Sequence, residues 1–207
     1  MHRAGGPMRR APLALEALAA LTLLAACVST PKKPAQIPTT PWPERRTQLQ
    51  TLDPFQLHGR VAVAAGNEGF SAHLDWEQQG MRSALQLNGP LGVGGIKVIA
   101  SGEDLNVTTS RGEALDADAA RTALSNRLGF DPPLASLRYW VLGVPDPSHP
   151  SVETLGPDQR LMTLEQDGWH IMYSAYMSGP AGYAVPQKMS LQRGAVRVRL
   201  IVDNWQA

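Results

Sequence analysis

From residue 55 onward, apolar and polar positions alternate along the chain with a period of two. The first run extends from Phe55 to Val63 and the second from Phe70 to Trp76, with the turn-forming segment Gly66-Asn67-Glu68-Gly69 between them. Shorter alternating runs follow around Leu85 and Leu87, Ile96 and Val98, and Leu105 and Val107. A period of two is typical of strands that bury one face and expose the other. This part of the chain therefore predicts an antiparallel sheet.

The pattern changes to helical spacing in the middle of the chain. Residues 114–128 are rich in Ala and are followed by Gly129, a common helix stop. Residues 133–142 form a second apolar segment of helical character. A short amphipathic helix is also expected near residue 42, since Trp42, Leu49 and Leu52 lie close to helical spacing.

After the helical segments the alternating pattern returns at residues 161–166, 169–176, 189–192 and 196–202. In the last of these, Val196, Val198, Leu200 and Val202 share one side, and Arg197 and Arg199 share the other. The elements therefore run from a short helix through strands and a helical pair to further strands. This order predicts a mainly β (α+β) fold, in which a curved antiparallel sheet carries helices on its concave side.

Composition and charge exclude several classes of function. The 207 residues include 19 Lys and Arg against 18 Asp and Glu, so the chain has no strong field to attract nucleic acid. Cys27 is the one cysteine, which excludes an intrachain disulfide and a zinc site with two thiolates. The five histidines lack metal-ligand spacing, and no nucleophile elbow, phosphate loop or dinucleotide fingerprint is present.

Two carboxylate pairs were the remaining candidates for catalysis. Asp75 with Glu77 fits the solvent face of a strand, and Asp116 with Asp118 fits the first turn of a helix. We therefore expect no catalytic residues, no metal site and no dissociable cofactor.

The N-terminal segment has the layout of a secretory signal. Basic residues at Arg3, Arg9 and Arg10 precede an apolar run from Ala17 to Ala26, which is shorter than the roughly 20 residues that a membrane-spanning helix needs. Glu16 directly precedes this run. Either the apolar region begins only at Ala17, or translation starts at Met8 and not at Met1.

The segment Leu24-Ala25-Ala26-Cys27 resembles the bacterial lipobox. This resemblance implies that residues 1–26 are removed and that Cys27 carries an S-diacylglycerol and an N-acyl chain. An ordinary secretion signal followed by a chance cysteine is the alternative. The residue after the cysteine is Val28 and not Asp, which by analogy with lipoproteins of Gram-negative bacteria favours the periplasmic face of the outer membrane. Residues 27–41 are rich in Pro and predict an extended tether with a reach of about 40 Å.

A set of segments spread over residues 42–205 resembles the LolB family of outer-membrane lipoproteins. They are Phe55–Val63, Trp76–Gln79, Leu85–Gly92, Leu137–Pro145, Gly168-Trp169 with Tyr173 and Tyr176, and Asp203-Asn204-Trp205. The resemblance implies that residues 42–207 form a lipoprotein-binding domain, a half-barrel of about eleven strands with a helical lid over an apolar cavity. It further implies a monomer that accepts cargo lipoproteins from the periplasmic carrier LolA and passes them into outer-membrane lipid.

Two groups of residues are candidates for this function. Pro90-Leu91-Gly92 predicts a turn with an apolar residue at its apex, and in LolB-like proteins this Leu lies on a loop that hands cargo to the membrane. A Leu91 that folds back to plug the end of the sheet is the alternative. Strand alternation and helix phase suggest the cavity lining: Trp76, Leu85, Leu87, Ile96, Val98, Leu137 and Trp140. The same residues could instead form a solid core, as in a lipoprotein that acts as a scaffold without lipid transfer.

Overall fold

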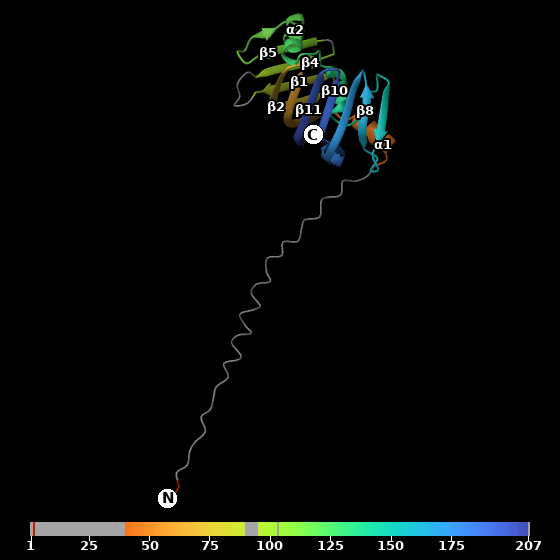
Figure 1. Cartoon of the computed structure of the whole chain (residues 1–207). Coiled ribbons are helices and arrows are strands. Elements are labelled where there is room, and N and C mark those ends of the chain that lie inside the picture. The colour runs from red at the N-terminus through yellow and green to blue at the C-terminus, as the bar shows by residue number, and fades with distance from the viewer. Residues whose placement is uncertain (1, 3–39, 90–94, 103, 207) are drawn as a thin grey trace. The chain divides into compact units, whose positions relative to one another are not determined.

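Eleven antiparallel strands form one open sheet in the computed structural model, which describes residues 2, 40–89, 95–102 and 104–206 (Figure 1). The strands are β1 Phe55–Ala65, β2 Glu68–Gln79, β3 Arg82–Asn88, β4 Ile96–Ser101, β5 Asp104–Thr109, β6 Ala114–Leu115, β7 Ser151–Leu155, β8 Leu161–Gln166, β9 Trp169–Ser178, β10 Ala184–Arg193 and β11 Val196–Gln206. Their order in the sheet is β6-β5-β4-β3-β2-β1-β11-β10-β9-β8-β7. The prediction of a mainly β fold with an antiparallel sheet is confirmed.

The first and last strands lie side by side at the centre of the sheet. β1 pairs with β2 on one side and with β11 on the other, so the strands before and after the helical segment share one continuous face. Val63, for example, lies opposite Phe70 of β2 and Val198 of β11. All strand pairings of the described chain lie within residues 55–206, and this part therefore contains the whole sheet.

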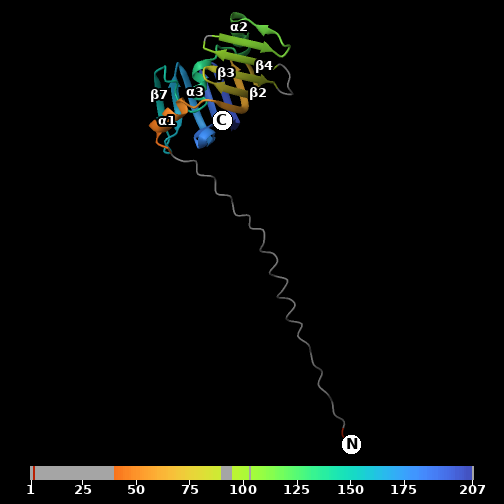
Figure 2. The same ribbon diagram turned by 180° about the vertical axis from the view of Figure 1, so that it is seen from behind.

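The described residues form three α-helices beside the sheet: α1 Trp42–Gln50, α2 Ala117–Leu128 and α3 Leu134–Trp140. A 3-10 turn, η2 Pro180–Gly182, connects β9 to β10. Figure 1 looks onto the outer face of the sheet, and the reverse view shows α1 and α3 on the other side (Figure 2). Among the described helices, none is long and apolar enough to span a membrane.

The helix predicted for residues 114–128 begins later than the Ala-rich pattern suggests. Ala114 and Leu115 pair with β5 as β6, and the helix starts only after Asp116. The carboxylate of Asp116 accepts a hydrogen bond of 2.8 Å from the amide of Ala119 and so caps the helix. Gly129 ends the helix in the left-handed conformation, at φ 76°. The Asp116–Asp118 pair is therefore the first turn of a helix, as expected.

The predicted alternation matches the burial of the strands. In β2, Ala72, Leu74 and Trp76 are buried, and Ser71 and His73 are exposed. The hairpin between β1 and β2 is tighter than predicted, because Ala65 already pairs with Glu68 and leaves a two-residue turn. β7 was not predicted at all, since it is a five-residue strand at the sheet edge whose Val152 is 65% exposed.

Candidate functional site

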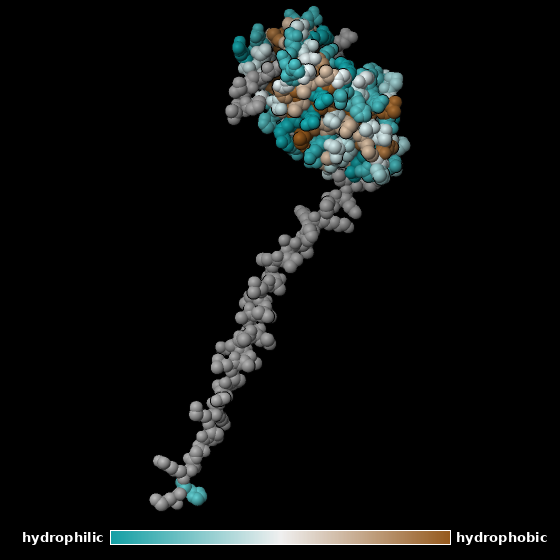
Figure 3. Space-filling view, in the orientation of Figure 1, coloured by the Kyte–Doolittle hydropathy of each residue, from teal (hydrophilic) through white to brown (hydrophobic). Residues whose placement is uncertain are grey.

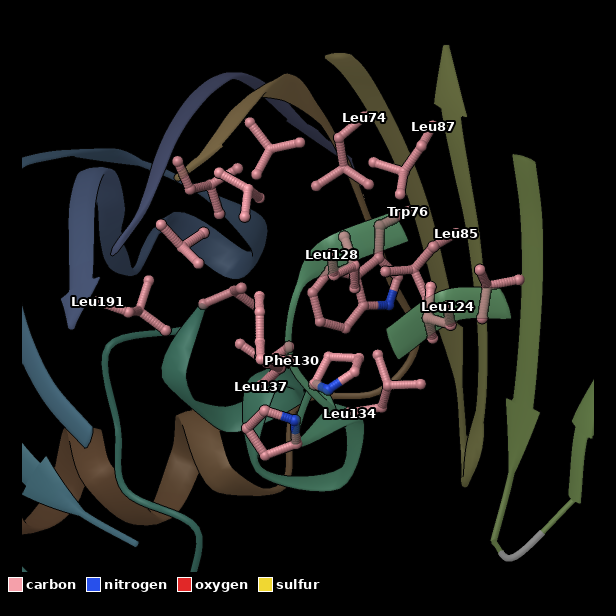
Figure 4. A pocket seen from close by; sticks show the side chains of 18 of the residues that line it. Leu74, Trp76, Leu85, Leu87, Leu124, Leu128, Phe130, Leu134, Leu137 and Leu191 are labelled. Carbon is pink, nitrogen blue, oxygen red and sulfur yellow. The ribbon is translucent and has the colours of Figure 1, made fainter. Parts of the chain in front are cut away.

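An apolar pocket lies between the inner face of the sheet and the helical segment of residues 117–141 (Figure 4). It contains about 820 Å³ of space not filled by protein atoms, part of it open to solvent. The sheet contributes Val61, Val63, Phe70, Leu74, Trp76, Leu85, Leu87, Val98, Trp169, Met189, Leu191, Val198 and Leu200, and the helical segment contributes Leu124, Leu128, Phe130, Pro132, Pro133, Leu134, Leu137 and Val141.

The lining contains no charged side chain and two indole nitrogens. The Nε1 of Trp76 donates a hydrogen bond of 3.1 Å to Oε1 of Gln78. The Nε1 of Trp169 is buried and has no hydrogen-bond partner among the described residues. A surface of this kind can bind hydrocarbon, and its side chains include no acid, base or metal ligand.

The helical segment covers the pocket without filling it. Phe130, Leu134 and Leu137 all point toward the pocket and remain only half-buried. In a solid core, side chains of this size in the same position would be fully buried, because protein interiors are packed to the density of organic crystals. The burial of these residues therefore favours a lid over a cavity.

Five of the seven residues predicted for the cavity line this pocket. They are Trp76, Leu85, Leu87, Val98 and Leu137. Ile96 and Trp140 are not part of the lining. Ile96 is the first residue of β4 and is half-buried at the edge of the core.

The phase of the second helical segment predicts Trp140 as part of the cavity lining. On α3, however, the residues that face the pocket are Leu134 and Leu137, followed by Val141 one turn later. Trp140 lies outside this stripe, is 0% exposed, and donates a hydrogen bond of 2.7 Å from Nε1 to Oε1 of Gln166. It is thus a core residue that attaches the helix to β8.

A buried polar network fixes α3 to strands β8 and β9. The hydroxyl of Ser136 donates to Oδ2 of Asp146 at 2.9 Å, and the hydroxyl of Tyr173 donates to the carbonyl of Trp140 at 3.0 Å. Burial raises the pKa of Tyr173 well above its usual value, so the phenol stays neutral and remains a donor. On the opposite side, Nη1 of Arg138 donates to the carbonyl of Gly80 at 2.7 Å. The lid is therefore held firmly at α3.

An ion pair at the surface extends this network. Nδ1 of His149 lies 2.6 Å from Oδ2 of Asp167, and this hydrogen bond, supported by the charge of the carboxylate, raises the pKa of His149. A raised pKa means that the protonated pair contributes stability below the imidazole pKa of the unfolded chain, near 6.5, and loses it as pH rises through the folded value.

We expect the imidazole of His149 to titrate above about 6.5 in the folded protein. The substitution Asp167→Asn removes the carboxylate and should lower the pKa of His149 toward that ordinary value. Proton–nitrogen NMR spectra recorded across a pH series measure both values. An unchanged titration midpoint in the Asp167→Asn variant would show that the pair does not form in solution.

The first helix is attached to the edge of the sheet. The Nε1 of Trp42 donates a hydrogen bond of 2.8 Å to Oε2 of Glu153 on β7, and Nη1 of Arg46 lies 2.8 Å from Oε1 of the same carboxylate. Arg45 is buried, and it donates to the backbone carbonyl of Gln159. Helix α1 is thus fixed to the sheet at its β7 edge.

The remaining predicted site residues lie outside the described residues. These are Cys27 and the turn Pro90-Leu91-Gly92. β3 ends at Asn88 and β4 begins at Ile96, so the chain that contains Leu91 connects these two strands. Among the residues that the structure does describe, no three His, Asp or Glu side chains lie together as a metal site would require.

Comparisons with known proteins identify relatives along most of the chain. The family model described as "Outer membrane lipoprotein LolB" matches residues 53–205. An outer-membrane lipoprotein LolB of Nitrosococcus oceani is 34% identical, over 91% of this chain and 94% of the relative. A LolB of Ectopseudomonas mendocina is 31% identical, over 90% and 92%. Among solved structures, a DUF1329 family protein of Desulfovibrio piger covers 79% of this chain and 89% of its own at a TM-score of 0.46 and 9% identity, which is too distant to bear on function.

Proposed function

The chain belongs to the LolB family of outer-membrane lipoproteins, and we propose that it accepts lipoproteins from the periplasmic carrier LolA in the apolar pocket and inserts them into the outer membrane. The protein is accordingly an outer-membrane, lipid-anchored component of lipoprotein localization. The observation that supports the finer proposal is the pocket itself, which has a purely apolar wall and a half-buried lid.

Hydrocarbon transfer through water explains why such a pocket is needed. A cargo acyl chain with about 15 buried methylenes would lose on the order of 12 kcal/mol if it crossed open water, at about 0.8 kcal/mol for each methylene. Free diffusion between membranes is therefore too slow, and a series of apolar sites is required. Each acceptor needs only to bind the chain more favourably than its donor, so no nucleotide hydrolysis is involved.

The anchor in this proposal is Cys27. Its S-diacylglycerol and N-acyl chains would hold the protein in the membrane, since two or more chains together give stable attachment. The Pro-rich segment that follows would let the domain move up to about 40 Å from the anchor. The domain could then meet the carrier in the periplasm and return to the bilayer without releasing its cargo.

Leu91 is the residue proposed to deliver cargo. If its side chain protrudes, Leu91→Ala leaves no cavity and should cost far less than the roughly 2–5 kcal/mol of a core leucine. Leu91→Glu should still take cargo from the carrier and should insert it poorly into liposomes, because a charge opposes about 1.5–3 kcal/mol of apolar burial in lipid. A two-step assay that scores receptor-bound cargo and lipid-bound cargo separately measures this difference.

Two outcomes would contradict the role of Leu91. A strongly destabilised Leu91→Ala variant would identify Leu91 as a plug at the end of the sheet. Normal insertion by Leu91→Glu would remove the turn from the delivery step.

A further inference from the structure

Exposed basic side chains gather on the outer face of the sheet, opposite the pocket. They are Arg60 on β1, His73 on β2, Lys188 on β10, and Arg197 and Arg199 on β11, and we call this group the basic face. These four strands are neighbours in the sheet, so the five side chains form one group. Figure 3 shows the same side of the molecule, where hydrophilic residues alternate with paler and brown ones.

The strand register leaves most of these charges without a partner. The residues opposite the two arginines of β11 are uncharged: Ala62 and Ser190 for Arg199, and Ala64 and Gln192 for Arg197. Arg60 forms an ion pair of 2.8 Å with Asp203. Lys188, Arg197 and Arg199 have no salt bridge within the described ranges. Like charges on one face of a sheet repel, so this arrangement favours an anionic partner.

The basic face stands out against the charge of the rest of the domain. Five of the 19 Lys and Arg residues and one of the 18 Asp and Glu residues precede Trp42, so the chain from Trp42 onward has a formal net charge of −3. A net-negative domain is repelled by anionic surfaces unless it presents a local basic region. The basic face supplies that region.

An exposed apolar side chain borders the basic face. Met172 of β9, 47% exposed, lies opposite Ser190, which in turn lies opposite Arg199, so methionine and arginine share one row across the sheet. Basic residues beside exposed apolar ones are typical of surfaces that rest on anionic bilayers, where the cations meet headgroups and the apolar side chains enter the interface.

The position of the basic face also agrees with a membrane partner. Asn88, the last residue of β3, lies opposite His73, and the chain leading to Leu91 leaves the sheet at this level. Strands β2, β1 and β11 continue past the row of His73. In the rows that follow, β11 carries Arg199 and then Arg197. The basic face and the strand end that leads to Leu91 therefore belong to the same end of the sheet.

We propose that the basic face binds anionic phospholipid headgroups of the outer membrane and so orients the receptor on the bilayer during delivery. This orientation rests on the proposed function, whereas the binding itself does not depend on cargo transfer. The contact is separate from the anchor at Cys27, because it uses the folded domain alone.

Vesicle flotation of a chain that lacks residues 1–27 tests the proposal, since this chain is unlipidated and retains every described helix and strand. We expect binding to vesicles of phosphatidylcholine mixed with phosphatidylglycerol, and much weaker binding to phosphatidylcholine alone. The double variant Arg197→Glu/Arg199→Glu should lower the partition coefficient for the anionic vesicles about tenfold or more. High salt should have a similar effect on the unaltered chain.

The matched control is Arg82→Glu/Arg111→Glu, which reverses two exposed arginines away from the basic face and should bind as the unaltered chain does. Equal binding to both kinds of vesicle, or an equal loss in both double variants, would overturn the proposal. If Arg197→Glu/Arg199→Glu kept vesicle binding but lost uptake of cargo from a loaded carrier, the partner of the basic face would be an acidic protein and not lipid. Uptake of a fluorescent acyl probe, measured in parallel, shows separately whether the pocket works.

Discussion

The substitution Leu134→Glu is expected to weaken acyl-chain binding by at least about 100-fold while the protein remains folded. Leu134 is half-buried, points into the pocket and is the first residue of α3. A carboxylate there must lose its hydration whenever hydrocarbon fills the pocket, and this costs several kcal/mol. An acidic residue in the first turn of a helix is otherwise favourable, so the fold should tolerate it. Displacement of a fluorescent fatty-acyl probe measures binding, and thermal melting measures stability.

Ala135→Glu is the matched control, because it places the same charge on the next residue of the helix, where the side chain is exposed. It should leave both binding and melting unchanged. Trp140→Ala gives the opposite pattern, with about 3–5 kcal/mol lost from the free energy of unfolding, since Trp140 is a fully buried core residue. If Leu134→Glu lost stability and binding together, the solid-core interpretation of this region would be favoured.

The substitution Cys27→Ser is expected to abolish membrane attachment. No other residue of the chain supplies a thiol for the diacylglycerol, so the variant should leave the outer-membrane fraction as an uncleaved or soluble periplasmic form. Membrane fractionation together with palmitate labelling measures the effect. Soluble chains that begin near Trp42 should still bind the acyl probe, because the tether contributes reach and no part of the pocket.

A Cys27→Ser variant that still incorporated palmitate and stayed with the outer membrane would contradict the assignment of Cys27. The proposed pocket would be unaffected by that result, since its lining begins at Val61.

Much of the fold could be predicted from the sequence because its strands are amphipathic. In β11, burial follows the alternation as far as Val202, with Leu200 buried and Arg199 exposed. The prediction failed where local pattern is weak. β6 has two residues beside a helix cap, and β7 is a short edge strand with an exposed valine, so neither carries a period that sequence alone can show.

The pocket was harder to predict because its lining joins distant parts of the chain. On the neighbouring strands β2 to β4, Trp76, Leu85, Leu87 and Val98 follow directly from the alternation and line the pocket, whereas Ile96 at the start of β4 does not. The contributions of Met189, Leu191 and Leu200 depend on the pairing of β1 with β11, which no local pattern reveals. The position of Trp140 could not be predicted, because an apolar residue on a short helix can face either a cavity or the core. Its hydrogen bond to Gln166, which places it in the core, joins residues far apart in the sequence.

The central claim is that cargo acyl chains occupy the pocket beneath α2 and α3. The most direct test uses a lipoprotein with a photoreactive acyl chain, delivered by the carrier to the receptor, illuminated, and mapped by mass spectrometry. We expect adducts on pocket residues such as Phe130, Leu137 and Met189, and their loss in the Leu134→Glu variant. Adducts confined to the outer face, at Met172, would contradict this expectation.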